Sequence, residues 1–315
     1  MKPARGKILV IRGGAIGDFI LTLPVLAALR RQFPETHVEV LGYPHIAQLA
    51  IAGGLADAVR SIEARALAGF FARGGPLEEK LAEYFSGFAL IISYLYDPDL
   101  IFQENVARAS AAQFIAGTHR PDETLDEHAT EVFLKPLERL AIFDADLLPR
   151  LTLAKTTEGI SLERRWLALH PGSGSEKKNW PEQRWGQLIA HFALLPDLNL
   201  LLVGGEAEGA RLQRLATALP AGRFQLAQSL PLVELAGRLK GCVGFIGHDS
   251  GITHLAAALG VASVVLWGGT RQSVWRPRHD HVSIIASGDG TAAGISIQSV
   301  IAGADRSFLR GAHRP

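Results

Sequence analysis

The sequence predicts an α/β protein made of two domains, each a parallel sheet covered by helices. Apolar strands alternate with amphipathic helices from the start of the chain, as in residues 7–42. The alternation is interrupted at residues 147–163, which show no periodicity and contain proline and glycine, and then resumes. With 315 residues the chain also exceeds one ordinary core. We therefore expect two Rossmann-like domains facing a central cleft, at residues 1–150 and 160–315, with the last helix packing back on the N-terminal domain.

The first domain begins with a strand, a glycine-rich turn and a helix, the order of a nucleotide-binding half. These elements are expected at residues 7–12, 13–18 and 19–32, and a second strand at 37–42. The glycines do not fit G-x-G-x-x-G, and the second strand does not end in the acidic residue that a ribose contact needs. We interpret the turn as a close approach of backbone to a ligand at the glycines Gly13, Gly14 and Gly17.

The remainder of this domain gives weaker signals. Further strands are expected at residues 58–62, 89–94 and 113–117, and a helix at 128–140. Asp18 stands at the start of the first helix, where a carboxylate interacts favourably with the helix dipole. The same position suits a general base that faces a cleft.

The second domain places small polar residues after its strands. Strands are expected at residues 166–170 and 198–205, the first followed by a small-residue loop that contains Ser173 and the second by Glu206. Pro181 is predicted as the first residue of a helix. Sites in open α/β sheets lie outside the carboxyl ends of the strands, so these polar groups are expected to share one edge.

Residues 242–260 read as a buried strand, a polar turn and a helix, and a second strand follows at 263–267. Asp249 and Ser250 are typical helix-capping residues, and Gly260 stands where a helix commonly ends. The free N–H groups and positive dipole at such a helix start bind anions, most often phosphate. An ordinary capped helix is the alternative for this turn alone. His254, one helical turn later, favours the anion site because a cap does not need it.

Net charge, cysteine content and the length of the apolar runs argue against several classes of protein. The formal net charge is +1, so no overall electrostatic attraction to nucleic acid is expected. One cysteine allows no internal disulfide and no metal cluster. The sequence shows no signal peptide and no apolar run long enough for a membrane helix, so we expect a cytoplasmic protein.

The polar groups of the second domain together suit a nucleoside diphosphate. Glu206 could accept hydrogen bonds from a ribose, and the phosphates would lie between Lys178 and the turn at Ser250 and Gly251. Taken singly, Lys178 could be a solvated lysine and Glu206 a first-turn helix carboxylate. Several such features on one edge are less easily explained in that way.

Several segments together resemble the ADP-heptose:lipopolysaccharide heptosyltransferase family, which is glycosyltransferase family 9 with the GT-B fold. They are Ile11-Arg12 through Gly17-Asp18 to Leu23-Pro24, His170-Pro171-Gly172, Lys178-Asn179-Trp180-Pro181, Trp185, Asp249-Ser250-Gly251 and Thr253-His254-Leu255. The resemblance implies a GT-B arrangement with an acceptor-binding N-terminal domain and a nucleotide-sugar-binding C-terminal domain. It implies an inverting transfer of a heptose to the lipopolysaccharide inner core, with no metal and no cofactor.

The resemblance also implies roles for residues. Asp18 would be the general base on the acceptor hydroxyl, Lys178 would pair with the diphosphate, and Glu206 would hold the ribose. The phosphate-side turn would consist of Asp249, Ser250, Gly251, Thr253 and His254. The implied partners are an ADP-sugar, a lipopolysaccharide-core or other glycan acceptor, and the cytoplasmic face of the inner membrane by peripheral contact, but no nucleic acid.

Asp97, Pro98 and Asp99 imitate the Asp-x-Asp metal motif of other glycosyltransferases. We interpret them as a turn or an acceptor contact because they lie in the half that does not bind the donor. Three alternatives remain for the function: a two-lobed nucleotide- or sugar-binding protein without catalysis, a GT-B enzyme that uses another nucleotide sugar, and a nicotinamide-dependent oxidoreductase. The missing G-x-G-x-x-G and the missing ribose acid disfavour the last.

Overall fold

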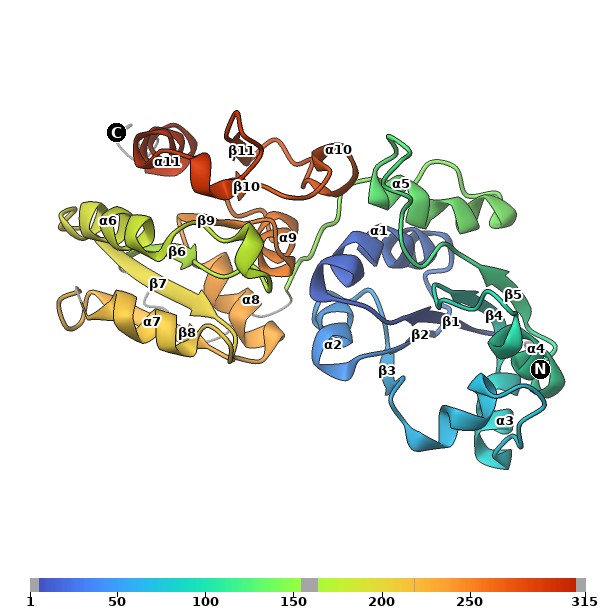
Figure 1. The fold of residues 1–315 in the computed structure, drawn as a ribbon. Helices are drawn as coiled ribbons and strands as arrows, with labels where there is room; N and C mark the ends of the chain where they lie inside the picture. The colour runs from blue at the N-terminus through green and yellow to red at the C-terminus, as the bar shows by residue number, and fades with distance from the viewer. Residues whose placement is uncertain (1–5, 154–163, 218, 310–315) are drawn as a thin grey trace. The chain divides into compact units, whose positions relative to one another are not determined.

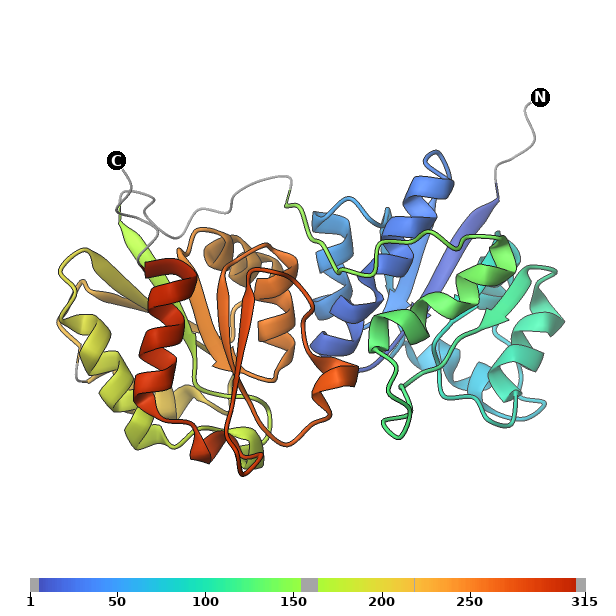
Figure 2. The same ribbon diagram turned by 90° about the horizontal axis from the view of Figure 1, so that it is seen from above.

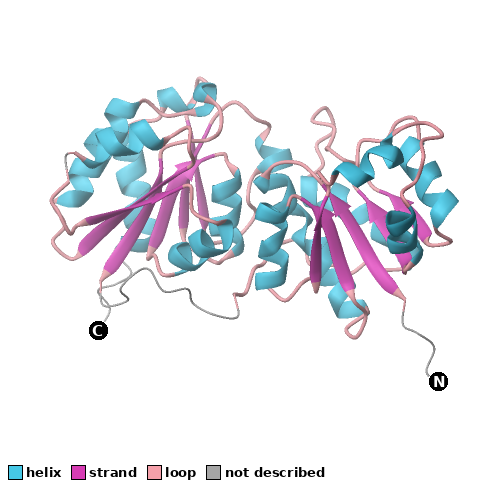
Figure 3. Ribbon diagram, turned by 90° about the horizontal axis from the view of Figure 1, so that it is seen from below, coloured by secondary structure: helices cyan, strands magenta, loops and turns pink. Residues whose placement is uncertain are grey.

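A computed structural model describes residues 6–153, 164–217 and 219–309 (Figure 1). The chain divides into two compact units, Met1–Ala154 and Lys155–Pro315. The interruption predicted at residues 147–163 is interpreted as the linker between the domains, and most of it, residues 154–163, lies outside the described residues. Each unit is a parallel sheet with helices on its faces, which confirms the predicted α/β class with two Rossmann-like domains (Figure 3).

The first unit contains a five-stranded sheet in the order β3-β2-β1-β4-β5. Its strands are β1 (Lys7–Arg12), β2 (Val38–Gly42), β3 (Ala58–Ser61), β4 (Phe88–Ser93) and β5 (Gln113–Ala116). All of the described strand pairs are parallel. Because β1 is central and β4 is its neighbour, the turns after these two strands leave the sheet side by side. The five predicted strands are confirmed to within one or two residues.

Helices cover this sheet on both faces. They are α1 (Ile16–Gln32), α2 (Pro44–Ala52), α3 (Glu79–Ser86), α4 (Ile101–Ala109) and α5 (Ala129–Leu134), with 3₁₀ helices at Arg65–Phe71 and Lys135–Leu140. The helix predicted over residues 128–140 is therefore two elements. Pro136 explains the break, because proline cannot donate an intrahelical hydrogen bond. One core cluster joins β1 and β4 to Phe70, Phe85 and Phe102.

The second unit contains a six-stranded sheet in the order β11-β10-β9-β6-β7-β8. Its strands are β6 (Arg165–His170), β7 (Leu198–Gly204), β8 (Phe224–Gln228), β9 (Gly244–His248), β10 (Ser263–Trp267) and β11 (Val282–Ala286). The predicted strands correspond to β6, β7, β9 and β10, whereas the two edge strands, β8 and β11, are not among the predictions. The central strands β6 and β9 are buried almost throughout.

The helices of this unit are α6 (Glu182–Ala193), α7 (Gly209–Ala216), α8 (Leu232–Lys240), α9 (Gly251–Ala258), α10 (Gln272–Trp275) and α11 (Ile297–Ala304). Pro181 is the N-cap of α6, so the helix begins one residue after the position predicted for its start. α11 packs on β10, β11 and α6 of its own unit (Figure 2), and the packing of the last helix on the N-terminal domain stays a prediction. Within the described ranges, no helix is long and apolar enough to cross a membrane.

Candidate functional site

The start of α9 forms the centre of the polar edge in the second unit. Ser250 has extended backbone angles, and its Oγ accepts a hydrogen bond of 3.4 Å from the N–H of Thr253, as an N-cap does. The Thr253 hydroxyl donates in turn to the carbonyl of His248. Gly260, with φ of +77°, follows the last residues of the helix. The predicted cap and helix end are thus confirmed, and the N–H groups of the first turn face out of the helix end.

Asp249 does not cap the helix as predicted but forms an ion pair. Its Oδ2 lies 2.8 Å from Lys178 Nζ and also accepts from the hydroxyl of Thr270, in the loop after β10. The Asp249 side chain is 8% exposed and that of Lys178 is 28% exposed. The interpretation of Lys178 as an unpaired surface lysine is therefore wrong. The ion pair fixes a cation beside the N-terminus of α9, at the shared edge of β6, β9 and β10.

Two buried histidines support the loops around this helix start. Trp180 N–H donates to His248 Nε2 at 2.8 Å, so Nδ1 carries the proton and donates to the carbonyl of Gly172 at 3.2 Å. His170 Nδ1 lies 3.3 Å from Ser250 Oγ. Burial lowers the pKa of His248 to about 4 and that of His170 to about 3, so both rings are neutral at physiological pH. His248 is not among the predicted site residues, although a histidine that ends a buried strand could have drawn attention to it.

Ser173 belongs to the loop after β6 and is engaged within that loop. Its Oγ lies 2.8 Å from the carbonyl oxygen of Ser175 and 2.7 Å from Asn179 Oδ1. A single hydroxyl proton serves one of these acceptors at a time. The side chain therefore holds the loop that leads to Lys178, and this structural role stands beside the predicted contact with a donor.

Two glutamates follow β7, and they differ in position. Glu206 is exposed in the turn after the strand. Glu208 is the N-cap residue of α7, and its Oε2 accepts a 2.9 Å hydrogen bond from Gly205 N–H. Its carboxylate also lies so close to Gly172 that a Cβ there would be 2.5 Å from Oε1. Glu208 thus contacts the loops after both β6 and β7. Sequence reasoning missed it because two carboxylates in one short turn look equivalent without coordinates.

Asp18 lies in the first unit, where α1 begins at Ile16 rather than at the predicted position 19. Its Oδ2 accepts a 3.0 Å hydrogen bond from the N–H of the N-cap residue Ala15. Its Oδ1 lies 3.7 Å from a guanidinium nitrogen of Arg12, and the side chain remains 27% exposed. The carboxylate therefore closes the helix start and also keeps an accessible edge.

The glycines of this turn differ in how strongly the backbone requires them. Gly14 has φ of +97°, which favours glycine, and a Cβ there would lie 2.9 Å from Asp18 Oδ2. Gly13 has open space around it, with its nearest neighbours at 4.0 Å, and Gly17 lies inside the first turn of α1. Gly14 therefore has a structural requirement that explains the residue type, whereas Gly13 has none of this kind.

Arg12 links the start of α1 at Asp18 to the loop that contains His119. The guanidinium lies over the ring of Phe133 at 4.4 Å and the ring of Tyr94 at 5.5 Å. It donates to the carbonyl of His119 at 2.8 Å and to the carbonyl of Asp18 at 3.3 Å. Arg12 is 3% exposed, and its guanidinium lies between these two loops and the aromatic faces.

The hydrogen bonds of Asp97 support the interpretation that Asp97, Pro98 and Asp99 form a turn. Its two carboxylate oxygens accept hydrogen bonds from the N–H groups of Phe102 and Gln103, at 3.1 and 3.0 Å, at the start of α4. Asp99 is exposed. Across the part of the chain that the structure describes, no group of three or more His, Cys, Asp or Glu side chains could hold a metal ion.

The structure thus brings Lys178, Asp249, Ser250 and Thr253 together at one edge of the second sheet. His254 is buried in α9, one turn further along, and its N–H donates to the carbonyl of Ser250 at 3.3 Å. Gly251 is the first residue of that helix. Asp18 and the glycine turn form a separate polar edge on the first sheet.

Known proteins resemble this chain over most of its length. A Haemophilus influenzae protein that carries the provisional name of glycosyltransferase is 23% identical over 301 residues, which are 87% of this chain and 86% of that protein. A crystal structure of glycosyl transferase family 9 from Veillonella parvula superposes with a TM-score of 0.80 at 19% identity, over 98% of this chain and 99% of the other. The structure of E. coli ADP-heptose lipopolysaccharide heptosyltransferase II gives 0.76 at 17% identity, over 97% and 99%. At these identities the structural matches establish the fold.

The family follows from the sequence itself. The model of glycosyltransferase family 9 (heptosyltransferase) matches residues 128–303, more than half of the 315-residue chain. The matched region includes the polar edge built by Lys178, Asp249 and the start of α9. The chain therefore belongs to glycosyltransferase family 9 and is a glycosyltransferase.

Proposed function

We propose that this enzyme transfers a heptose from ADP-heptose to a lipopolysaccharide inner-core acceptor, with inversion at the anomeric carbon and without a metal ion. The observation that carries the proposal is the juxtaposition of Lys178, Asp249 and the N-terminus of α9. The name of the E. coli structure, an ADP-heptose lipopolysaccharide heptosyltransferase, supports this choice of donor and acceptor for the family.

In this proposal the second unit binds the donor diphosphate. The first-turn N–H groups of α9 and its positive dipole would receive phosphate oxygens. Lys178 would add a cation whose position is fixed beforehand by Asp249 and Thr270. Negative charge grows on the diphosphate as its bond to the sugar breaks, and preorganised donors lower the energy of that state.

We propose a carboxylate from the turn after β7 as the ribose contact. Glu206 is the residue that the family resemblance implies, whereas Glu208 lies against the loops after β6 and β7. Their separate replacement by Gln distinguishes them, because a hydrogen bond to a charged group contributes about 1.5–3 kcal/mol, or roughly ten- to a hundredfold in affinity. The residue whose replacement weakens ADP binding by that factor, at unchanged melting temperature, is the contact.

Asp18 is proposed as the general base on the acceptor. Its carboxylate would take the proton of an acceptor hydroxyl while the hydroxyl oxygen bonds to the anomeric carbon. The bond from that carbon to the diphosphate oxygen breaks on the opposite side, and ADP leaves. The partial exposure of Asp18, at 27%, supports access of a substrate to the carboxylate. A cytoplasmic location and a peripheral contact with the inner membrane remain predictions from this choice of donor and acceptor.

A thermal-shift panel of ADP, UDP, GDP and NAD tests the donor. ADP should raise the melting temperature, since a ligand at a hundredfold excess over its Kd stabilises by about 2.7 kcal/mol. Lys178→Ala should remove most of the shift. Lys135→Ala, which removes an exposed lysine paired with Glu127 in the first unit, serves as the matched control.

The outcomes of this panel separate the candidate functions. A shift with UDP and none with ADP would identify an enzyme that uses another nucleotide sugar. No shift with any purine diphosphate would contradict the donor proposal. Transfer itself is then tested with ADP-heptose and a deacylated inner-core oligosaccharide, and the product is identified by mass spectrometry.

A further inference from the structure

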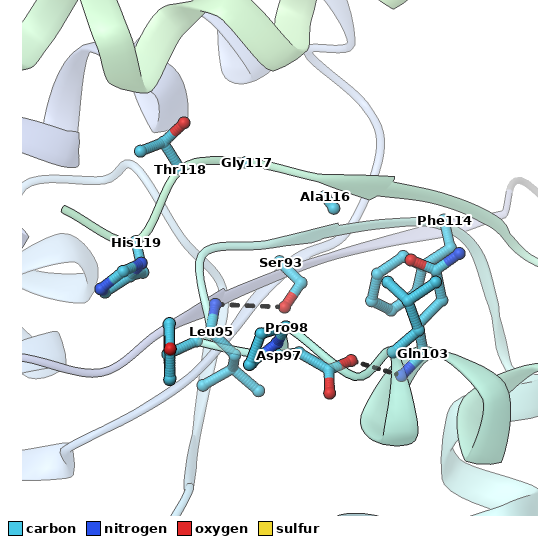
Figure 4. Close-up of a pocket in the computed structure, with 12 residues that line it drawn as sticks. Ser93, Leu95, Asp97, Pro98, Gln103, Phe114, Ala116, Gly117, Thr118 and His119 are labelled. Carbon is cyan, nitrogen blue, oxygen red and sulfur yellow. Dashed lines mark hydrogen bonds between the residues drawn. The ribbon is translucent and has the colours of Figure 1, made fainter. Parts of the chain in front are cut away.

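A pocket of about 210 Å³ lies at the carboxyl ends of β4 and β5 in the first unit (Figure 4). Ligand pockets for drug-sized molecules measure about 300–1,000 Å³, so this pocket suits a single small ring. The residues that line it and enter the following argument are Tyr96, Asp97, Leu100, Gln103, Thr118 and His119. We call it the Tyr96 pocket.

Exposed apolar surface gathers at the mouth of the Tyr96 pocket. Tyr96 is 72% exposed and its ring lies 4.7 Å from that of His119, centroid to centroid. Leu100 is 48% exposed and has φ of +55°, a left-handed conformation that leucine rarely adopts. Backbone strain of this kind gathers at functional sites. An exposed aromatic face beside it offers a flat surface for the C–H face of a ring.

The charges around the Tyr96 pocket favour an uncharged ligand. Among the described residues that line the pocket, none is a lysine or an arginine. The Asp97 carboxylate accepts hydrogen bonds from two N–H groups of α4, and its negative charge would repel a phosphate or carboxylate in the pocket. Arg12, which contacts the carbonyl of His119, is buried beneath aromatic rings, and Arg120, the next residue after His119, pairs with Glu123 at 2.8 Å.

Uncharged polar groups complete the lining. The hydroxyl of Thr118 and the side-chain amide of Gln103 can each donate and accept hydrogen bonds. An aromatic face together with hydroxyl and amide groups matches a sugar, which has an apolar C–H face and a rim of hydroxyls. An anionic ligand would instead require the cationic partners that bind phosphate and carboxylate elsewhere.

Arg12 connects the Tyr96 pocket to the proposed base. Its guanidinium donates to the carbonyl of His119, which lines the pocket, and lies 3.7 Å from Asp18 Oδ1. Both contacts occur at the edge where β1 and β4 are neighbours. A ring held in the pocket is therefore close to the only turn in this unit that we assign a catalytic role.

We infer that the Tyr96 pocket binds the acceptor sugar and selects an uncharged one over a phosphorylated or carboxylated one. The inference rests on the proposed function for the identity of the second substrate as a glycan and of Asp18 as the base. It adds the chemical class of the sugar that lies beside Asp18.

Saturation-transfer NMR on the full chain tests the pocket with three probes. These are methyl α-mannopyranoside, its 6-phosphate and methyl glucuronide. The neutral glycoside should bind most tightly, with saturation strongest at its C–H protons. Tyr96→Ala should weaken its binding roughly two- to tenfold, the range for loss of an aromatic contact. Tyr96→Phe should keep it, and Phe143→Ala, which removes a ring 75% exposed elsewhere in the unit, should leave it unchanged.

The inference is overturned if either charged probe binds as tightly as the neutral one, if Tyr96→Ala binds like the wild type, or if no probe binds. The ADP-induced melting shift is recorded on the same samples and should be equal in Tyr96→Ala and the wild type. If ADP gives no melting shift but sugar binding depends on Tyr96, the donor proposal is wrong and the inference about the Tyr96 pocket is kept. If ADP gives the normal shift but sugar binding does not depend on Tyr96, the donor proposal is kept and the inference about the pocket is wrong.

Discussion

Acidification should destabilise the second unit through His248 and His170, the two buried histidines that support the loops around the start of α9. His248 is fully buried, and its Nε2 accepts the N–H of Trp180, so protonation of that nitrogen both breaks a hydrogen bond and places a charge in the core. Burial lowers the pKa of His248 to about 4 and that of His170 to about 3. An unfolded histidine titrates near pH 6.5.

The sign of the effect follows from these values. Each folded-state pKa lies below the unfolded one, so the unfolded chain binds more protons below about pH 6.5. The stabilisation is complete above that pH and is lost as the pH falls toward 4. A gap of about 2.5 pKa units at about 1.36 kcal/mol each makes roughly 3 kcal/mol for His248. His170 adds a loss of similar order that continues to about pH 3.

Urea unfolding followed by tryptophan fluorescence measures this effect in the relevant unit. All five tryptophans of the chain, Trp166, Trp180, Trp185, Trp267 and Trp275, belong to the second unit. The Trp185 ring lies 5.4 Å from that of His248. We expect the free energy of unfolding to fall steadily between pH 7 and pH 4.5.

His248→Gln provides the decisive comparison. The glutamine can still accept the N–H of Trp180, but it cannot titrate. We expect lower stability at pH 8 and roughly half the wild-type slope between pH 7 and pH 4.5, because His170 still titrates. His191→Gln, at an exposed position of α6, is the control and should keep the wild-type slope. If His248→Gln keeps the full slope as well, the acid sensitivity has another origin.

Three further predictions concern catalysis and packing. Asp18→Asn should lower kcat by about 10²–10⁴-fold with unchanged ADP affinity; a lower melting temperature with normal activity per folded molecule would make Asp18 only a helix-start residue. EDTA should leave turnover unchanged, because in the proposed mechanism Lys178 and the α9 N–H groups stabilise the leaving diphosphate; inactivation that Mg²⁺ or Mn²⁺ reverses would contradict this. Gly117→Ala should destabilise by about 1–3 kcal/mol in urea unfolding, because its Cβ would lie 2.6 Å from the Tyr94 ring, whereas Gly186→Ala, with open space in α6, should not.

The sequence predicted the central strands better than the edges for a physical reason. β1, β6 and β9 are buried on both faces and therefore appear as continuous apolar runs. The edge strands β8 and β11 are mostly half-buried, and their mixed polar pattern gives no comparable signal. The prediction of one continuous helix over residues 128–140 is wrong because the helical sequence pattern continues past Pro136, whereas the α-helix ends before it.

The candidate site shows the same division between local and distant interactions. The cap at Ser250 depends on a bond to Thr253, three residues away, and could be predicted from residue types. The partner of Lys178 is Asp249, 71 residues further along the chain, and only the folded sheet brings them together. The carboxylate of Glu208 gains its place from the approach of two loops, which no spacing in the sequence encodes.

The bonds of Arg12 also constrain how this enzyme could change its acceptor in evolution. One guanidinium fixes the main chain at His119 and the start of α1 at Asp18, so a shift of either loop disturbs the other. Lysine could not replace it, because a single ammonium group lacks the planar fork that reaches both carbonyls. New acceptor preferences are therefore expected to arise from side chains such as Tyr96 and Thr118, which Arg12 does not bind, while the backbone geometry of the proposed base is retained.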